Sequence, residues 1–323
     1  MSSRVVDTAE RPKVIAIVGP TGVGKTDVAE ELARSIGGEL ISADSMQVYR
    51  GMDIGTAKPA PAARRVPYHC VDLVEPGTPY SAALYQRDAR AAIDSVAARH
   101  KVPVVCGGTG LYVRAALDDW EFPTGERTTP ERARLEALAD ELGAPGMHAR
   151  LAEIDPAAAA AIHPNNTRRV IRALEMAEGG TSYAEQAERF SARDPWYPTT
   201  FVGLTMDRRE LYARIDARVD GMIDAGIAAE VADLLSAGYR DALTATQAIG
   251  YKEIIPVLEG ESTLADAAAA IKQATRRYAK RQLTWFRGDP RIQWLDVTGL
   301  SGFEPVAGVL KLIESSVPGE MRQ

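Results

Sequence analysis

Eight residues near the N-terminus have the types and spacing of a phosphate-binding loop. The stretch Gly19-Pro-Thr-Gly-Val-Gly-Lys-Thr26 directly follows the apolar run 14–18, so the sequence predicts a buried strand, a glycine-rich loop and a helix. In such a loop, backbone N–H groups and the helix N-terminus surround an anionic oxygen, and Lys25 adds a positive charge. Thr26 Oγ1 is placed to hold Mg²⁺. The expected phosphate contacts are Gly19, Pro20, Thr21, Gly22, Val23, Gly24, Lys25 and Thr26.

A carboxylate is expected to face the same crevice. Residues 39–43 are predicted as a second strand that ends at Asp44, and open α/β sheets bind ligands at the carboxyl ends of their strands. A second glycine-rich turn, residues 107–110, follows the strand 102–106 at the same rim. Neither this strand nor 201–204 delivers the second aspartate that ATPases and GTPases use for Mg²⁺. These patterns favour a group-transfer enzyme of nucleotide-kinase-like build, with Asp44 as general base.

Charge is distributed unevenly along the chain. The net charge is −6, yet the segment 272–291 carries seven basic residues against the single acid Asp289. Taken as a helix, this segment has one basic face and an opposite stripe for which we predict burial, marked by Ile271, Ala274, Tyr278 and Trp285. A solvated helix face is the alternative interpretation, but the near-absence of acids favours an anionic partner.

Composition narrows the class of protein. The 323 residues are 46% apolar and 25% charged, enough for one large domain and a smaller one. No apolar run approaches the roughly 20 residues of a membrane helix, so we expect a cytoplasmic protein without a membrane partner. Cys70 and Cys106 are expected to pack in the core, and the four histidines lack the spacing of a zinc site.

Strand and helix patterns alternate in the first part of the chain, with strands expected at 14–18, 39–43, 68–74 and 102–106 and helices at 27–36 and 81–100. From Trp120 the pattern becomes helical, and strand character returns at 200–204. We therefore predict an α/β fold with a P-loop NTPase-like parallel sheet core flanked by helices. The core comprises 1–120 and 199–323, and a small all-helical domain is inserted at 121–198. Its boundaries bear proline and glycine, so it could move as a unit.

Several longer motifs resemble the tRNA dimethylallyltransferase family, also called tRNA isopentenyltransferase. They are the phosphate loop 19–26, SADSMQVYRGMDIGTAKP at 42–59, GGTGLY at 107–112, AIGYK at 248–252 and TRRYAKRQLTWFR at 275–287. The resemblance spans nearly the whole chain. It implies transfer of a dimethylallyl group from dimethylallyl diphosphate to N6 of adenosine 37 in tRNAs that read codons beginning with U, with release of pyrophosphate.

The resemblance also implies roles for single residues. Asp44 would accept a proton from the adenine amine, Thr109 would fix base and donor, and Lys25 and Thr26-bound Mg²⁺ would stabilise the departing pyrophosphate. The adenine would be flipped out of the anticodon loop. Arg214 and Arg218 are candidate diphosphate ligands, with surface ion pairing as the alternative. The residues implied for tRNA contact are Asp44, Ser45, Met46, Gln47, Thr109, Arg168, Arg169, Arg172, Gln247, Gly250, Tyr251, Lys252, Lys280, Arg281, Gln282, Thr284, Trp285 and Arg287.

Two positions depart from the family's common pattern. Asn166 stands where the family commonly has Asp, and Arg168 stands where it commonly has Gln. The first changes a candidate helix cap, and the second adds charge toward RNA. For Trp285, core packing and base stacking both stay open, and we expect core packing. We expect a monomer.

Three other functions compete with the tRNA transferase. An adenylate isopentenyltransferase shares the phosphate loop and Asp44 but needs neither the basic helix nor a clasping insertion. A small-molecule or nucleotide kinase would bind ATP in the loop and turn it over. A non-enzymatic RNA-binding module leaves Lys25, Thr26 and Asp44 without a purpose.

Overall fold

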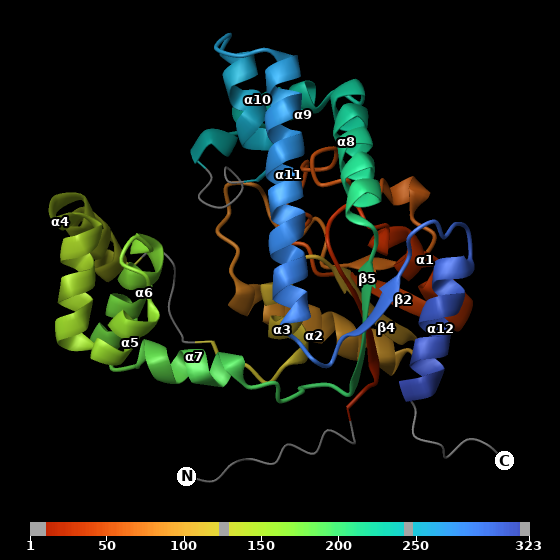
Figure 1. Cartoon of the computed structure of the whole chain (residues 1–323), viewed down its shortest axis with the longest axis horizontal. Coiled ribbons are helices and arrows are strands. Elements are labelled where there is room, and N and C mark those ends of the chain that lie inside the picture. Colours follow the sequence, from red (N-terminus) through yellow and green to blue (C-terminus); the bar gives the residue numbers. More distant parts are fainter. Residues whose placement is uncertain (1–10, 123–128, 242–247, 317–323) are drawn as a thin grey trace. The chain divides into compact units, whose positions relative to one another are not determined.

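The structure, a computed structural model, describes residues 11–122, 129–241 and 248–316. The chain forms two compact units, one made of residues 1–118 and 195–323 and the other of residues 119–194. Figure 1 shows the elements of both units along the chain. No helix among the described residues is long and apolar enough to cross a membrane.

A parallel six-stranded sheet forms the centre of the larger unit, in the order β3-β2-β4-β1-β5-β6. The central strand β1 is apolar and buried at all five positions, as expected for a parallel strand covered on both faces. It pairs with β4 on one side and β5 on the other. The strands are β1 (Val14–Val18), β2 (Gly38–Ser42), β3 (Tyr68–His69), β4 (Val102–Gly107), β5 (Thr199–Thr205) and β6 (Gln293–Asp296).

Helices cover this sheet and extend beyond it (Figure 1). Helix α11 packs along α8 and α10 and contacts α3, while α1 packs on α12. The helices of the larger unit are α1 (Lys25–Ile36), α2 (Ala82–Ala98), α3 (Gly110–Leu117), α8 (Arg208–Asp224), α9 (Ile227–Ser236), α10 (Tyr251–Leu258), α11 (Leu264–Arg287) and α12 (Glu304–Ser316), with 3₁₀ turns η2 (Pro61–Ala63) and η3 (Tyr239–Asp241).

The strand that we predict at 68–74 is mostly wrong. Only Tyr68 and His69 pair with β2, and the chain then turns, with Cys70 at φ 60° and Asp72 at φ 55°. The turn brings the Asp72 carboxylate onto Lys58 Nζ at 2.6 Å, an ion pair that a continued strand would not make. Cys70 is nevertheless buried and Cys106 is packed against the main core, and burial raises the pKa of each thiol to about 12.

The described residues of the smaller unit form helices only. Leu135, Met147 and Leu174 centre a separate apolar core, and Arg132 pairs with Glu175 across α4 and α6 at 3.3 Å. The Asn166 side chain caps α6, accepting a bond from the N–H of Arg169 at 3.4 Å, so the cap survives the change from Asp. The helices are α4 (Pro130–Ile154), α5 (Pro156–Ala161), α6 (Thr167–Glu178) and α7 (Tyr183–Ser191).

Candidate active site

The phosphate loop lies between β1 and α1, as the sequence predicts. Gly24 precedes the helix at φ 92°, a left-handed conformation that favours glycine, and turns the chain so that α1 begins at Lys25. Lys25 Nζ donates to the Pro20 carbonyl at 2.7 Å, so the ammonium lies over the loop. Burial lowers the Lys25 pKa to about 8, although Cys106 and Asp44 act in the opposite direction. Incoming negative charge would favour the protonated form.

Two arginines of α8 lie near this loop, and they differ in their hydrogen-bond partners and their exposure. Arg218 donates to Thr21 Oγ1 at 3.2 Å, and burial lowers its pKa from the usual arginine value. Arg214 pairs with Glu210 at 2.7 Å and is 41% exposed, as expected for a surface ion pair. Of the two candidates, Arg218 therefore has the better position to face a bound diphosphate.

Asp44 follows β2 at the rim of the sheet, beside the glycine-rich turn after β4. Its Oδ1 accepts a hydrogen bond from Met46 N–H at 2.9 Å. Thr109 Oγ1 accepts from Ser45 N–H at 3.1 Å, and Thr109 N–H donates to the Ala43 carbonyl at 3.1 Å. The turn at 107–110 and the segment at 43–46 are thus bonded together beside the phosphate loop.

A pocket of about 410 Å³ opens beside Asp44. Thr21 of the phosphate loop and Arg218 line it, as do Arg277 and Arg281 of α11. Further lining residues come from 44–46, 55–56, 215–222, 248–252 and 271–281.

Gln282 of α11 joins two of the glycine-rich loops. Its Oε1 accepts from Thr21 N–H at 2.8 Å, and its Nε2 donates to the Gly108 carbonyl at 2.9 Å. The residue is 6% exposed, and both the oxygen and the nitrogen of its side-chain amide are bonded to the loops. This placement supports a role in holding the loops in place of the direct tRNA contact that the resemblance implies.

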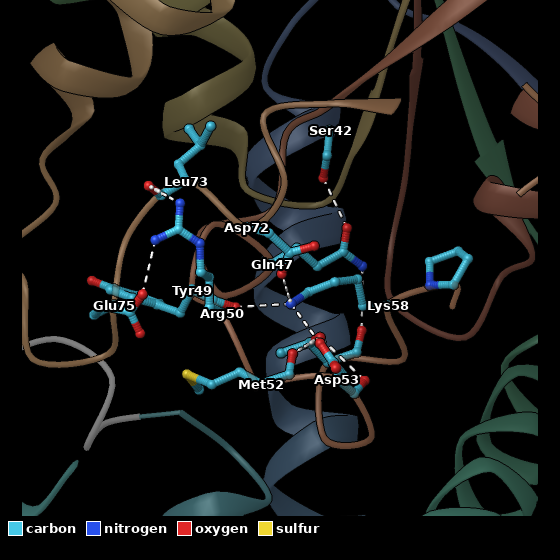
Figure 2. A network of polar contacts seen from close by, with 12 residues as sticks. Ser42, Gln47, Tyr49, Arg50, Met52, Asp53, Lys58, Asp72, Leu73 and Glu75 are labelled. Carbon is cyan, nitrogen blue, oxygen red and sulfur yellow. Dashed lines mark hydrogen bonds and ion pairs between the residues drawn. The ribbon is translucent and has the colours of Figure 1, made fainter. Parts of the chain in front are cut away.

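The segment after Asp44 is held from inside by a buried lysine. Figure 2 shows Lys58 Nζ at the centre of this network, bonded to the Tyr49 carbonyl at 2.8 Å and to Asp53 and Asp72 at 2.6 Å each. Gln47 is also buried, and its Oε1 accepts from Ser42 Oγ at 2.9 Å. Gln47 therefore anchors the segment, in contrast to the base contact that the resemblance implies.

Tyr251 is fully buried, which favours packing inside the protein over stacking on a base. Its hydroxyl donates to Glu230 Oε1 at 2.7 Å, and its ring packs against Gly55. Gly250, in an irregular conformation at φ 99°, precedes α10, and Lys252 is exposed where it lines the pocket. Gln247, the first residue of this expected contact segment, lies outside the described residues.

Helix α11 presents a shorter basic face than the sequence suggests. Lys272 and Arg276 pair with Asp220 at 2.6 Å and Asp216 at 3.1 Å, acids that come from α8. The sequence count missed these partners because they lie some fifty residues away along the chain. Among the residues expected to contact tRNA, the exposed ones on α11 are Lys280, Arg281, Thr284, Trp285 and Arg287.

The core packing that we expect for Trp285 is wrong, because the side chain is 47% exposed. One edge of its ring lies so close to Gly110 that a Cβ there would meet the indole at 2.1 Å. The buried positions of this stretch are Ala279, Gln282 and Phe286. Trp285 thus leaves a face open beside the basic residues.

The second basic cluster lies in the smaller unit, at the start of α6. Arg168 and Arg169 are exposed, whereas Arg172 is half-exposed and pairs with Glu175 at 3.3 Å. Arg168 and Arg169 therefore supply most of the unpaired charge of this cluster.

Protein ligands for a metal are sparse at the phosphate loop. Within the described part of the chain, no three His, Cys, Asp or Glu side chains are placed to hold a metal ion together. The Thr26 hydroxyl stands at the first turn of α1, half-buried. This donor set fits Mg²⁺, which keeps several waters and takes its other ligands from substrate phosphates.

The fold and this pocket define an α/β protein with a P-loop NTPase-like core. The model of the IPP transferase family matches residues 47–289, and that of isopentenyl transferase matches 12–66. The chain belongs to the IPP transferase family.

Curated relatives and solved structures agree with this assignment. The tRNA dimethylallyltransferase of Carboxydothermus hydrogenoformans is 50% identical over 286 residues, 88% of this chain and 92% of the relative. The tRNA isopentenylpyrophosphate transferase of Bacillus halodurans is 41% identical, with a TM-score of 0.70 over 94% of this chain and 96% of its own. A eukaryotic dimethylallyltransferase acting on tRNA is 29% identical, with a TM-score of 0.79 over 96% and 81%.

Proposed function

We propose that this protein transfers the dimethylallyl group of dimethylallyl diphosphate to N6 of adenosine 37 in tRNAs that read codons beginning with U, and releases pyrophosphate. The observation that carries the proposal is one pocket bordered by Asp44, the phosphate loop and the basic face of α11. The names of the relatives support the reaction class and the tRNA acceptor.

The phosphate loop and Arg218 bind the diphosphate of the donor. As the bond between the allylic carbon and its oxygen breaks, negative charge grows on the leaving pyrophosphate, and Lys25 and Arg218 stabilise it. Both cations are preorganised, because Lys25 is bonded to Pro20 and Arg218 to Thr21. Mg²⁺, held by Thr26, waters and diphosphate oxygens, would supply further neutralisation of this charge.

Asp44 serves the acceptor. The N6 lone pair forms the new bond to the allylic carbon, and the electrons of the carbon–oxygen bond leave with pyrophosphate. The amine then carries one proton too many, which passes to the Asp44 carboxylate. Because Met46 N–H occupies Oδ1, the second oxygen is available to the substrate. Thr109 holds the segment that bears this carboxylate.

The exposed side chains of α11 bind the RNA. Lys280, Arg281 and Arg287 neutralise phosphates, and the open face of Trp285 offers a surface for a base. The helical unit, expected at 121–198, clasps the anticodon stem through Arg168 and Arg169. The protein acts as a monomer in the cytoplasm, where its tRNA substrates reside.

One assay separates this function from its rivals. The protein is incubated with Mg²⁺, labelled dimethylallyl diphosphate and three acceptors: an anticodon stem-loop bearing A36 and A37, the same loop with G37, and AMP. We expect label in the A37 loop alone. Label in AMP would indicate an adenylate isopentenyltransferase, and absence of transfer together with ATP turnover would indicate a kinase.

A further inference from the structure

The half-buried carboxylate of Glu230 on α9 lies outside the sequence motifs described above. It accepts four hydrogen bonds. Oε2 accepts from the N–H groups of Asp53 at 3.1 Å and Ile54 at 2.7 Å, and Oε1 accepts from Gly55 N–H at 3.2 Å and the Tyr251 hydroxyl at 2.7 Å. Three consecutive amides and a buried phenol therefore converge on one side chain.

Two of these partners, Gly55 and Tyr251, line different parts of the pocket wall beside Asp44. Gly55 belongs to the wall that continues from Asp44, and Tyr251 begins α10 on the other wall. The two walls also meet in direct contact, since a Cβ on Gly55 would lie 2.3 Å from the Tyr251 ring. Glu230 thus bonds both walls where Gly55 and Tyr251 touch.

Lys58 and Gln47 make further contacts that hold the wall bearing Asp44. Lys58 binds the Asp53 carboxylate, while Glu230 binds the backbone N–H of the same residue (Figure 2 shows the Lys58 side). Gln47 also holds this segment. Its Oε1 accepts from Ser42 Oγ of β2, and its Nε2 donates to the carbonyl of Thr56. Movement of the loop at 53–55 would therefore be passed along a bonded segment toward Asp44.

We propose that Glu230, with Tyr251, is a positioning residue that sets the spacing of the two pocket walls and so places the acceptor amine against Asp44. This inference rests on the proposed transfer reaction. Glu230 is not among the residues that line the pocket, and the Tyr251 hydroxyl points to it, so the effect should appear in turnover with tRNA. A misplacement of about 1 Å at a reacting centre can cost on the order of 100-fold in rate.

The test compares Glu230→Gln, Tyr251→Phe and the double variant with the wild type. Glutamine keeps the length but puts an N–H₂ group where the carboxylate accepted from N–H groups. Phenylalanine keeps the ring against Gly55 and removes only one of the four hydrogen bonds. Tyr251→Phe therefore serves as the milder variant if Glu230→Gln folds poorly. Asp233→Asn is the matched control, because Asp233 is an exposed carboxylate on the same helix.

For Glu230→Gln we expect kcat with the A37 stem-loop to fall about tenfold or more, while the Kd of dimethylallyl diphosphate changes less than twofold. Tyr251→Phe should lower kcat about threefold, and the double variant should be no worse than Glu230→Gln, since both act on one contact. Asp233→Asn should match the wild type.

Other outcomes overturn the inference. Unchanged kcat in both single variants would show that the walls do not depend on Glu230. A lower unfolding midpoint with full turnover per folded molecule would reduce Glu230 to a stabilising contact. The wild type in the same assay distinguishes failure of this inference from failure of the proposed function. If the wild type transfers no dimethylallyl group, both the inference and the proposed function are overturned.

Discussion

The side-chain oxygen of Gln282 accepts a hydrogen bond from the backbone N–H of Thr21 at 2.8 Å. This bond joins α11, whose outer face is exposed and basic, to the loop expected to hold the donor diphosphate. The same amide reaches the Gly108 carbonyl, beside Thr109. The phosphate loop, the turn at 107–110 and the basic helix α11 are therefore joined by one buried side chain.

Replacing Gln282 by methionine should weaken donor binding. The shape is nearly kept, but Thr21 N–H and the Gly108 carbonyl each lose a buried partner, which costs about 1–3 kcal/mol per group. We expect the KM for dimethylallyl diphosphate to rise roughly tenfold or more, which corresponds to about 1.4 kcal/mol or more. Steady-state kinetics would measure it, with Gln273→Met, an exposed position on α11, as control. An unchanged KM would show that the loop holds its shape alone.

Donor binding should depend on pH through Lys25. Its pKa is lowered to about 8 in the folded protein, so the free protein loses this charge as the pH rises past 8. The diphosphate favours the protonated form, and binding above pH 8 must therefore take up a proton. We expect the Kd to rise about fivefold between pH 8 and 9, with proton uptake visible by calorimetry in buffers of different ionisation enthalpy.

Lys25→Arg provides the comparison for this pH effect, because a guanidinium keeps its charge throughout the range. That variant should bind more weakly but with a flat profile. A flat profile in the wild type as well would mean that Lys25 keeps its proton in the free protein.

Asp44→Asn should separate chemistry from binding. Asparagine can still accept the hydrogen bond from Met46 N–H, so the turn that holds this segment is retained. It cannot take up the amine proton, and we expect kcat to fall about 100-fold or more with little change in the Kd of the stem-loop. Single-turnover transfer and a binding titration would measure the two quantities. Equal losses in both would remove the general-base role.

The sequence predicts the parts of this molecule that depend on local patterns. The buried strand, glycine loop and helix at 14–36 follow from an apolar run and from glycine geometry, and the structure confirms them. The third strand ends at His69, because the turn that follows pairs Asp72 with Lys58, a tertiary contact that strand propensity does not encode. Glu230 is missed for the same reason, since its three backbone partners lie about 175 residues earlier along the chain.

Trp285 illustrates a different failure. Seven-residue spacing from Tyr278 predicts that both share a buried face, which would hold if α11 packed against one helix throughout. Toward its C-terminal end α11 instead meets the glycine-rich loops, where Gln282 enters and Gly110 leaves room for the edge of the indole. The buried positions therefore shift to Ala279, Gln282 and Phe286.

The basic residues of α11 should fall into two groups. Arg277 and Arg281 line the pocket side and have no carboxylate ion pair among the described residues, whereas Lys272 and Arg276 are paired with Asp220 and Asp216. Reversing the charge of Arg277 and Arg281 together should weaken stem-loop binding and reduce its salt dependence by roughly one unit of log–log slope per lost phosphate contact.

Binding titrations at several salt concentrations would test this division, with Lys272→Ala and Arg276→Ala as matched controls. In these controls the charges removed are already neutralised by α8, so the slope should stay close to that of the wild type. A slope unchanged by the double reversal would place the RNA away from α11. A slope that falls equally in both sets would mean that the pairs to α8 open on binding and that the whole helix face meets the phosphates.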